Sequence, residues 1–244
     1  MIDWHSHILP KMDDGSRSVE ETLALLAMQK EQGVTTVVAT PHFYANDETV
    51  ETFLERRQKA MARLADTLPN DAPKIILGAE VRYYRGISRL ADLKALRVEG
   101  SKILLLEMPV GKWSEDMVRE LVEMSSMSRV RIVLAHIERY YQLQSASVWN
   151  RLYECGILMQ VNASFFSSFA SKRKAVSLLR KGGIHFIGSD CHNTSSRKPM
   201  MDKAIDVIRK KFGDEYLYQM TEYGYSMLED KNLTGSLSHE SRKH

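Results

Sequence analysis

Seven short apolar segments rich in valine, isoleucine and leucine recur along this chain, and each is followed by a stretch with the pattern of a helix. The first opens the chain, and the others cover residues 34–40, 74–80, 103–107, 130–136, 157–162 and 184–190. Segments this short and this apolar are typical of parallel strands that are covered on both faces. Their alternation with helices predicts an α/β fold with a parallel sheet, and seven units around one core favour a barrel over an open sheet.

The helices between these strands are marked by caps and by breaking residues. Ser18 to Glu21 has the form of a capping box, and Gly33 ends the helix that begins there. Helical patterns also cover residues 48–68, 88–96, 113–126, 147–154, 171–181, 199–212 and 214–229. We therefore expect a single domain over residues 1–230 and a polar, mobile tail over residues 231–244.

Histidine, aspartate or glutamate stands at the end of six of the seven predicted strands. Nine such side chains lie at these ends or just after them: His5, His7, Asp14, His42, Glu80, Glu107, His136, Asp190 and His192. In a βα barrel the carboxyl ends of the strands meet at one face, where the chemistry takes place. Nine groups are too many for one ion with about four to six ligands, so the sequence predicts two or three metal ions.

The residue types at these positions also indicate which metals and which chemistry to expect. His5 and His7 are two residues apart, so on a strand both imidazoles point the same way, although such a pair alone is often only a polar strand end. Imidazole together with carboxylate suits manganese, zinc or iron better than magnesium or calcium. Clustered ions lower the pKa of a bridging water and neutralise a phosphoryl group, which predicts a metal-dependent hydrolase of phosphate esters.

Charge and hydropathy exclude other classes of protein. The formal net charge is +3, from 34 basic and 31 acidic residues interspersed along the chain, and no basic cluster predicts a nucleic acid partner. No window approaches the roughly eighteen apolar residues of a membrane span, and we expect no secretory leader. The two cysteines, Cys155 and Cys191, indicate neither disulfides nor a zinc site. We expect a soluble, cytoplasmic protein without membrane insertion.

Six motifs, in order along residues 1 to about 230, resemble the polymerase and histidinol phosphatase (PHP) domain family. They are His5-Ser6-His7 with Asp13-Asp14-Gly15, Thr40-Pro41-His42, Gly78-Ala79-Glu80, Glu107, Ala135-His136 and Ser189-Asp190-Cys191-His192. Within that family, two further stretches resemble the bacterial manganese-dependent tyrosine-protein phosphatases of capsule and exopolysaccharide operons. These stretches are His7-Ile8-Leu9-Pro10 and His136-x-Glu138-Arg139-Tyr140.

The resemblance implies a fold, a set of metal ligands and a substrate. The fold would be a distorted seven-stranded (βα) barrel of the PHP type, similar to a TIM barrel, with two or three divalent ions, expected to be Mn²⁺, with iron or zinc as alternatives. The family's pattern would place His5, His7, Glu80 and Asp190 on one ion, Glu80, Glu107 and His136 on a second, and Asp14, His42 and His192 on a third. The activity would be hydrolysis of phosphotyrosine by a metal-activated hydroxide, and the partner an autophosphorylating tyrosine kinase of a polysaccharide pathway.

Two arginines are candidates for binding the phosphoryl group. The guanidinium of Arg139 is a fixed fork of donors that matches phosphate oxygens, and Arg197 is a second candidate. A surface ion pair is the alternative for Arg139, and simple solvation is the alternative for Arg197. The resembled branch usually has proline where Ile137 stands and a small residue where Cys191 stands, but neither is a ligand position.

Three alternative functions remain open. Cys191 and Arg197 have the spacing of cysteine-dependent phosphatases, but the loop between them lacks glycine and Asp190 would raise the pKa of the thiol. The same metal barrel could instead cleave a small phosphomonoester such as histidinol phosphate or, with less support, act as a phosphodiesterase or nuclease. A non-catalytic metal-stabilised module is the third alternative, but such a module would not require Arg139.

Some residues near the strand ends have no predicted catalytic role. His185 lies inside an apolar strand and is expected in the core or lining the barrel, rather than as a ligand. Aromatic residues that follow strands, among them Tyr44, Tyr141 and Phe165, could flank a phosphotyrosine ring, although most such residues simply pack. The sequence alone therefore does not derive a preference for tyrosine.

Overall fold

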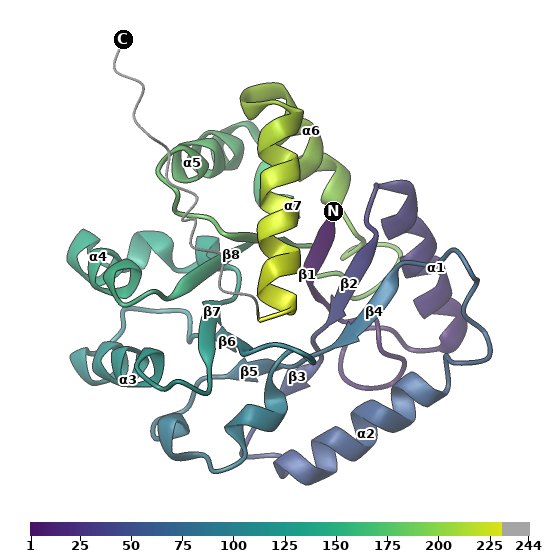
Figure 1. The fold of residues 1–244 in the computed structure, drawn as a ribbon, viewed down its shortest axis with the longest axis horizontal. Helices are drawn as coiled ribbons and strands as arrows, with labels where there is room; N and C mark the ends of the chain where they lie inside the picture. Colours follow the sequence, from purple (N-terminus) through teal and green to yellow (C-terminus); the bar gives the residue numbers. More distant parts are fainter. Residues whose placement is uncertain (231–244) are drawn as a thin grey trace.

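The computed structural model describes residues 1–230, in which strands and helices alternate along the chain (Figure 1). The strand segments are β1 Ile2–Ser6, β2 Thr36–Ala39, β3 His42–Phe43, β4 Lys74–Leu77, β5 Glu80–Arg82, β6 Ile103–Glu107, β7 Arg131–Leu134, β8 Leu158–Asn162 and β9 Phe186–Gly188. The α-helices are α1 Val19–Glu31, α2 Val50–Ala62, α3 Glu115–Ser125, α4 Ala146–Glu154, α5 Phe169–Arg180, α6 Met201–Phe212 and α7 Asp214–Leu228. The tail predicted over residues 231–244 lies outside the described residues.

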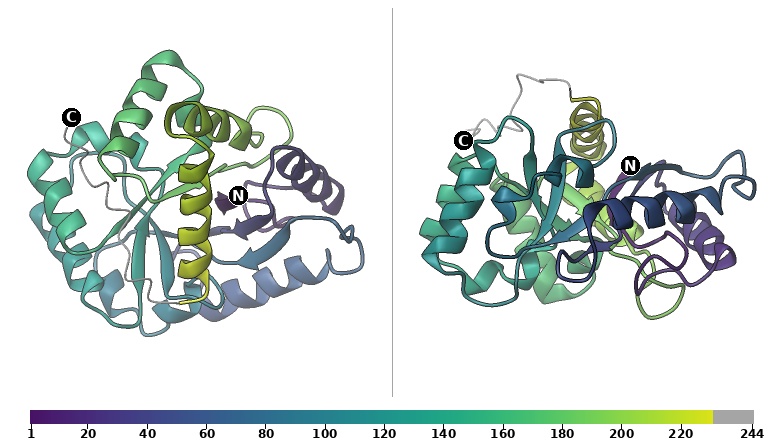
Figure 2. Two further views of the ribbon diagram at one scale, coloured as in Figure 1. Left: turned by 45° about the horizontal axis from the view of Figure 1, so that its top comes forward. Right: turned by 90° about the horizontal axis from the view of Figure 1, so that it is seen from below.

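The strands form a parallel sheet that curls (Figure 1). β1, β2 and β4 pair in one part, and β3, β5, β6, β7, β8 and β9 pair in that order in the other. Backbone hydrogen bonds also join the end of β1 to the segment that follows β9. Asp190 N donates to His5 O at 2.7 Å, and His7 N donates to Cys191 O at 2.9 Å. The segments after β9 and β1 therefore lie side by side, and the helices cover the outside of the curled sheet, with α7 crossing it near β1 (Figure 2).

The strand count differs from the sequence prediction because two predicted strands are each split in two. Residues 34–40 were expected as one strand, but β2 ends at Ala39 and β3 begins at His42. Pro41 lies in the gap and has no N–H with which to continue the ladder. Residues 74–80 divide likewise at Gly78, although Glu80 N still donates to Pro41 O at 3.0 Å.

Alternate residues of the strands belong to two different clusters of the core. In β6, Leu104 and Leu106 pack in the large cluster that the outer helices cover. Ile103 and Leu105 pack in a smaller cluster that includes Trp4 and the end of α7. Both faces of the sheet are thus covered by apolar side chains, as the uniformly apolar strand segments predict.

Two predicted helices differ from what the structure shows. Residues 88–96 form two short 3₁₀ turns, η1 Ile87–Arg89 and η2 Leu93–Leu96, in place of an α-helix. The helix predicted over residues 48–68 ends at Ala62 and continues as tighter turns, in which Thr67 N donates to Leu64 O at 2.9 Å. Among the described helices, none has the length and hydropathy needed to cross a membrane.

His185 is partly buried and lies just before β9, so it is neither inside a strand nor in the buried core. Its Nδ1 accepts the N–H of Met159 at 3.1 Å, and burial lowers the pKa of this imidazole to about 4. Because the folded state disfavours the protonated ring, the unfolded state binds more protons between pH 6.5 and 4. Stability contributed by neutral His185 is therefore complete above about pH 6.5 and is lost as the pH falls towards 4.

We predict that a His185→Asn variant, which keeps an acceptor for the Met159 N–H, loses less stability on acidification than the parent protein. The difference in the change of unfolding free energy between pH 7 and pH 4.5 should be about 1 to 3 kcal/mol. Urea unfolding of both proteins at several pH values measures it. Parallel pH profiles for the two proteins would contradict the role given to His185.

Candidate metal centre

All nine side chains predicted as metal ligands come together at the carboxyl ends of the strands. Five lie on strands or directly next to them: His5, His7, His42, Glu80 and Glu107. His136 and Asp190 follow β7 and β9 by two residues each, and His192 and Asp14 lie on the adjoining loops. The fold thus assembles groups from opposite ends of the sequence, because parallel strands end at the same edge of the sheet.

Glu80 lies at the centre of this group and is only 1% exposed. Its Oε2 lies 3.1 Å from His5 Nε2, 3.3 Å from His7 Nε2 and 3.0 Å from His42 Nδ1. Its Oε1 lies 2.9 Å from the fourth imidazole, at His136 Nε2. One buried carboxylate is therefore surrounded by four imidazoles from three different strand ends, those of β1, β3 and β7.

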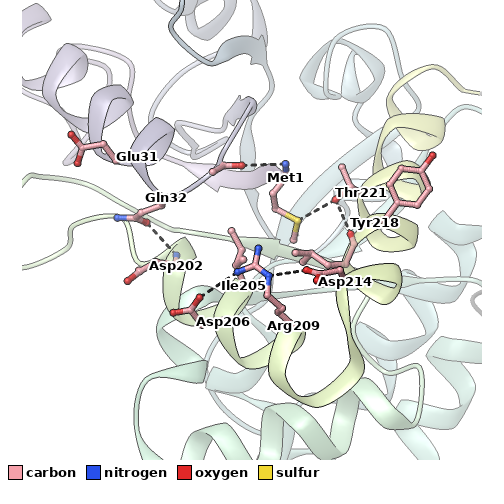
Figure 3. Close-up of a pocket in the computed structure, with 12 residues that line it drawn as sticks. Met1, Glu31, Gln32, Asp202, Ile205, Asp206, Arg209, Asp214, Tyr218 and Thr221 are labelled. Carbon is pink, nitrogen blue, oxygen red and sulfur yellow. Dashed lines mark hydrogen bonds and ion pairs between the residues drawn. The ribbon is translucent and has the colours of Figure 1, made fainter.

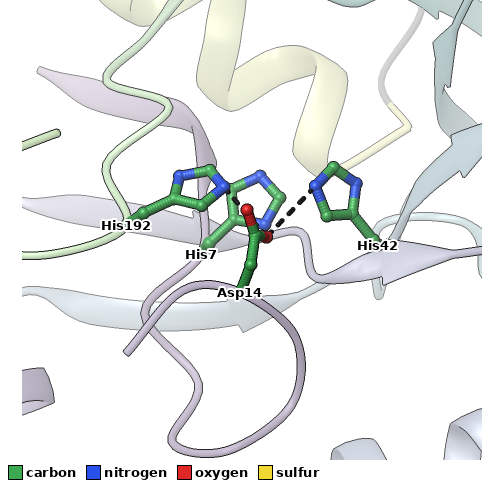
Figure 4. A group of neighbouring side chains, drawn as sticks. All are labelled: His7, Asp14, His42 and His192. Carbon is green, nitrogen blue, oxygen red and sulfur yellow. Dashed lines mark ion pairs between the residues drawn. The ribbon is translucent and has the colours of Figure 1, made fainter. Parts of the chain in front are cut away.

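A second group surrounds Asp14 at the outer edge of the cluster (Figure 4). Asp14 Oδ1 lies 3.3 Å from His192 Nε2 and 3.5 Å from His42 Nε2. The ring of His7 stacks on that of His192 with centroids 3.9 Å apart. One ligand atom from each of these four residues lies within 4.8 Å of the other three, a spacing compatible with a shared cation.

The observed groups overlap more than the three sets implied by the family resemblance. Besides the group in Figure 4, His5, His7 and Asp190 converge, as do His42, Glu80 and Glu107. His7 and His42 therefore each face two groups. His136 contacts Glu107 as well as Glu80, with His136 Nε2 lying 3.5 Å from Glu107 Oε1.

The chemistry of the cluster fits divalent cations. Glu80 Oε2, His42 Nδ1 and His192 Nε2 are buried and make no hydrogen bond among the described residues, although other ligand atoms surround them. Lone pairs of imidazole and carboxylate that converge without sharing hydrogens form a donor set for a metal such as manganese, iron or zinc. Buried polar groups of this kind are costly unless a partner satisfies them.

The charges within the cluster are balanced between carboxylates and imidazoles. Burial alone would raise the pKa of Glu80, but the imidazoles of His5, His136 and His42 outweigh it and hold that pKa well below the usual value. Burial works in the opposite sense on His136, but Glu107 and Glu80 raise its pKa to about 9. Divalent cations binding such a site would replace those imidazole protons with their own charge.

Close contacts with two glycines fix the positions of His5 on β1 and of His7 directly after it. A Cβ at Gly188 would lie 2.4 Å from the Cβ of His5, and a Cβ at Gly15 would lie 2.2 Å from the carbonyl oxygen of His7. No side chain larger than hydrogen fits at either glycine without moving these histidines.

His136 and Asp190 have positive φ angles, of 32° and 52°, which are unfavourable for residues other than glycine.

Side chains behind the ligands orient them, and sequence reasoning gave these no role. Asp13 Oδ2 lies 2.7 Å from His7 Nδ1 and accepts the His42 backbone N–H at 2.9 Å. Gln160 Oε1 accepts the His136 N–H at 2.6 Å and lies 3.3 Å from His5 Nδ1. The sequence offered one signal for Gln160. It stands two residues before Asn162, the last residue of β8, and side chains two apart on a strand point to the same face of the sheet.

The two predicted phosphate-binding arginines lie at the rim of the cluster. Arg139 Nη2 donates to Asp190 Oδ2 at 2.5 Å, and Arg197 Nη2 donates to Asp190 Oδ1 at 3.1 Å. Their side chains are 37% and 41% exposed, so each guanidinium contacts both the cluster and the solvent. A third arginine, Arg82, donates to Glu107 Oε2 at 2.8 Å, and its place two residues after Glu80 on β5 was a signal that the sequence reasoning missed.

Cys191 is unsuited to act as a nucleophile. Its side chain is fully buried, and burial raises the pKa of the thiol to about 12, with the charge of Asp3 acting in the same sense. A thiolate is therefore disfavoured at neutral pH. The geometry argues against the alternative based on the spacing of Cys191 and Arg197.

A separate hollow lies between the end of α1 and the helices α6 and α7 (Figure 3). Its volume is about 580 Å³, and its lining includes Met1, Gln32 and Tyr218. Arg209 within it is paired, with its Nε 2.8 Å from Asp214 Oδ1. The lining contains no histidine, and the hollow shares no residue with the metal cluster.

Comparison with known proteins finds similarity along nearly the whole chain. The family described as capsular polysaccharide synthesis, CpsB/CapC, matches residues 1–226. Tyrosine-protein phosphatase YwqE of Bacillus subtilis is 30% identical over 246 residues, covering 96% of this chain and 93% of the relative. Tyrosine-protein phosphatase CpsB of Streptococcus pneumoniae is 34% identical over 229 residues, covering 87% of this chain and 91% of the relative.

Solved structures agree with this similarity. A structure from work on YwqE of Bacillus subtilis and CpsB of Streptococcus pneumoniae, described as unique metal-dependent tyrosine phosphatases, superposes with a TM-score of 0.80. The two chains are 26% identical, and the match covers 96% of each. A chain of an archaeal ribonuclease P complex shares the fold alone, with a TM-score of 0.58 at 13% identity.

We predict that Asp13→Asn weakens metal binding without unfolding the protein. The carboxylate of Asp13 holds the Nδ1 side of His7, so that Nε2 faces the cluster, and loss of such a partner typically costs about tenfold to a hundredfold in metal affinity. Titration of metal-stripped protein with Mn²⁺ against a fluorescent chelator measures the affinity. Asp71→Asn, which changes an exposed aspartate paired with Lys30, is the matched control and should bind as the parent does. Equal affinities for all three proteins would remove Asp13 from the centre.

Proposed function

Because the chain belongs to the capsular polysaccharide synthesis CpsB/CapC family, we propose that it is a metal-dependent protein-tyrosine phosphatase. The observation that carries the proposal is the convergence of nine imidazole and carboxylate groups with two arginines at their rim. This arrangement suits hydrolysis of a phosphate monoester, in which a nucleophile must be generated and the phosphoryl charge must be balanced.

The residues of the chain would divide this work between them. Divalent ions held by the nine side chains would supply activated water and positive charge at the phosphoryl group. Arg139 and Arg197 would bind the phosphoryl oxygens, since each has N–H groups directed at the cluster and a face open to solvent. Asp13 would hold the imidazole of His7 in the orientation that binds a metal, and Gln160 would fix the backbone of His136.

We extend the proposal to the composition of the centre and to the fold. Two or three ions, with manganese the expected metal, would share Glu80 as the bridging ligand, and residues 1–230 would form a single domain. The curled sheet would be a distorted seven-stranded barrel of the PHP type, with β2 and β3 as one interrupted strand and β4 and β5 as another. Two observations support this. Only two residues separate β2 from β3 and β4 from β5, and backbone hydrogen bonds continue across both interruptions.

The expected substrate is a phosphotyrosyl protein, and the expected partner is an autophosphorylated tyrosine kinase of a polysaccharide pathway. The two relatives that are named as tyrosine-protein phosphatases, and the capsule family to which the chain belongs, support this assignment. A cytoplasmic location stays a prediction.

The proposal is tested by the release of phosphate from three substrates: a phosphotyrosyl peptide, a phosphoseryl peptide and histidinol phosphate. Metal-stripped protein is compared with and without added Mn²⁺. Activity that manganese restores only on the phosphotyrosyl peptide supports the proposal. Restored activity mainly on histidinol phosphate would keep the metal chemistry but overturn the substrate, and activity that is indifferent to stripping would overturn the metal chemistry.

We predict that Arg139→Ala lowers turnover of a phosphotyrosyl peptide by about a hundredfold while the content of bound metal stays unchanged. Arg139 is not among the nine candidate ligands but contacts Asp190 from the rim, so its loss removes a phosphate contact rather than a metal contact. Steady-state kinetics and metal analysis on the same preparation measure both quantities. Arg151→Ala is the control, because this arginine is 40% exposed and pairs with a surface carboxylate on α3. Unaltered turnover in Arg139→Ala would remove this residue from the mechanism.

A further inference from the structure

A groove of about 540 Å³ lies between α4 and α5, next to the rim of the metal centre. Aromatic side chains line one part of it, namely Tyr141, Trp149 and Phe165. Tyr141 stacks on the buried Trp149 with ring centroids 4.8 Å apart, and Trp149 Nε1 donates to the carbonyl of Tyr141 at 3.0 Å. These contacts hold the two rings in fixed positions, so this part of the groove is pre-formed.

Lysines form the opposite side of the groove. Lys174 and Lys181 on and just after α5 both line it, and both are exposed. They stand seven residues apart, two turns of helix, so they lie on the same side of α5 at a separation of about 10 Å. Three residues of an extended peptide cover about the same distance, at roughly 3.3 Å per residue.

The basic charge around this groove is not neutralised by neighbouring acids. Between Glu154 and Asp190 the sequence has no acidic residue but has five basic ones: Lys172, Arg173, Lys174, Arg180 and Lys181. None of the five makes an ion pair within residues 1–230, whereas Lys30, Arg56 and Arg209 on other helices all do. The expectation that basic residues are evenly interspersed is therefore wrong for this segment, which presents a patch of uncompensated positive charge.

Hydrogen bonds connect the lining of the groove to the rim of the metal centre, beginning with Glu138 Oε1, which accepts the backbone N–H of Asn162 at 3.2 Å. Glu138 lines the groove, and the next residue is Arg139, whose guanidinium contacts Asp190. Phe165 in the groove follows Asn162 by three residues, and Asn162 Nδ2 donates to Asp190 Oδ2 at 2.8 Å. A polypeptide whose phosphate lies at Arg139 can therefore place residues near its phosphotyrosine in the groove.

We infer that the groove between α4 and α5 binds an acidic segment of the substrate polypeptide next to its phosphotyrosine, and this inference rests on the proposed function. Carboxylates about three residues apart in an extended segment would pair with Lys174 and Lys181, and its apolar parts would pack on the aromatic side. Glu138 also lines the groove, but its Oε2 is buried and makes no hydrogen bond among residues 1–230. The acidic side chains of the peptide would therefore lie away from Glu138, against the lysines.

The test compares two phosphotyrosyl peptides that differ only in flanking residues, glutamates in one and glutamines in the other. Three proteins are used: the parent, Lys174→Gln/Lys181→Gln, and the control Lys210→Gln/Lys211→Gln. The control removes the same charge from the exposed end of α6, where neither lysine makes an ion pair within the described chain. The readouts are kcat and KM for each peptide, turnover of p-nitrophenyl phosphate, and peptide affinity by fluorescence anisotropy on the manganese-loaded proteins.

We expect the parent to prefer the acidic peptide in kcat/KM and in affinity by about threefold to tenfold, as two charge pairs at a partly exposed site would give. The groove variant should lose this preference through KM and affinity, with turnover of p-nitrophenyl phosphate unchanged. The control should keep the preference. A weaker preference at high salt is expected, because such pairs are screened.

Three outcomes would overturn the inference. Equal use of the two peptides by the parent would leave the phosphatase assignment intact and remove the groove from substrate selection. A preference that survives in the groove variant would place the selecting residues elsewhere. Absence of a peptide preference together with lysine-dependent binding to phosphatidylserine vesicles would assign the patch to a membrane surface.

Failure of the proposed function gives a different result. If neither peptide is hydrolysed, the proposed function fails, and the anisotropy measurement alone then decides whether the groove selects acidic peptides.

Discussion

The contact of one buried carboxylate, Glu80, with four imidazoles is the interaction on which the rest of the site depends. A carboxylate that is 1% exposed is unfavourable unless positive charge surrounds it, and here that charge comes from imidazoles at three different strand ends. The parallel sheet makes this possible, because it brings β1, β3, β5 and the end of β7 to one edge. The curl of the sheet then turns these ends towards a common centre (Figure 1).

Much of this arrangement could be predicted from the sequence, since six of the seven predicted strands supplied a candidate ligand at or near the carboxyl end. The nine ligand positions were all found together, and the α/β alternation was confirmed. The split at Pro41 was not predicted, because the loss of one ladder donor is visible only when the neighbouring strand is in place. The role of Gln160 was missed for a similar reason: its two contacts, with His5 and His136, join three strands that are far apart in sequence.

In our two proposals, the chemistry of the centre and the selection of its substrate would depend on different parts of the structure. The candidate metal cluster and its arginines would recognise the phosphoryl group, which any phosphate ester shares. The aromatic and basic groove between α4 and α5 lies outside the cluster but begins one residue from Arg139. Composition alone hid this feature, because a net charge of +3 over the chain conceals a segment without any acid between Glu154 and Asp190.

The central claim is that the nine side chains form one centre for several divalent ions. The most direct test is the number of ions bound per chain, counted by mass spectrometry of manganese-loaded, dialysed protein and located by anomalous diffraction at the manganese edge. The account predicts two or three ions per chain, with Glu80 as a ligand of more than one of them. A single ion, or ions bound away from Glu80, would contradict it.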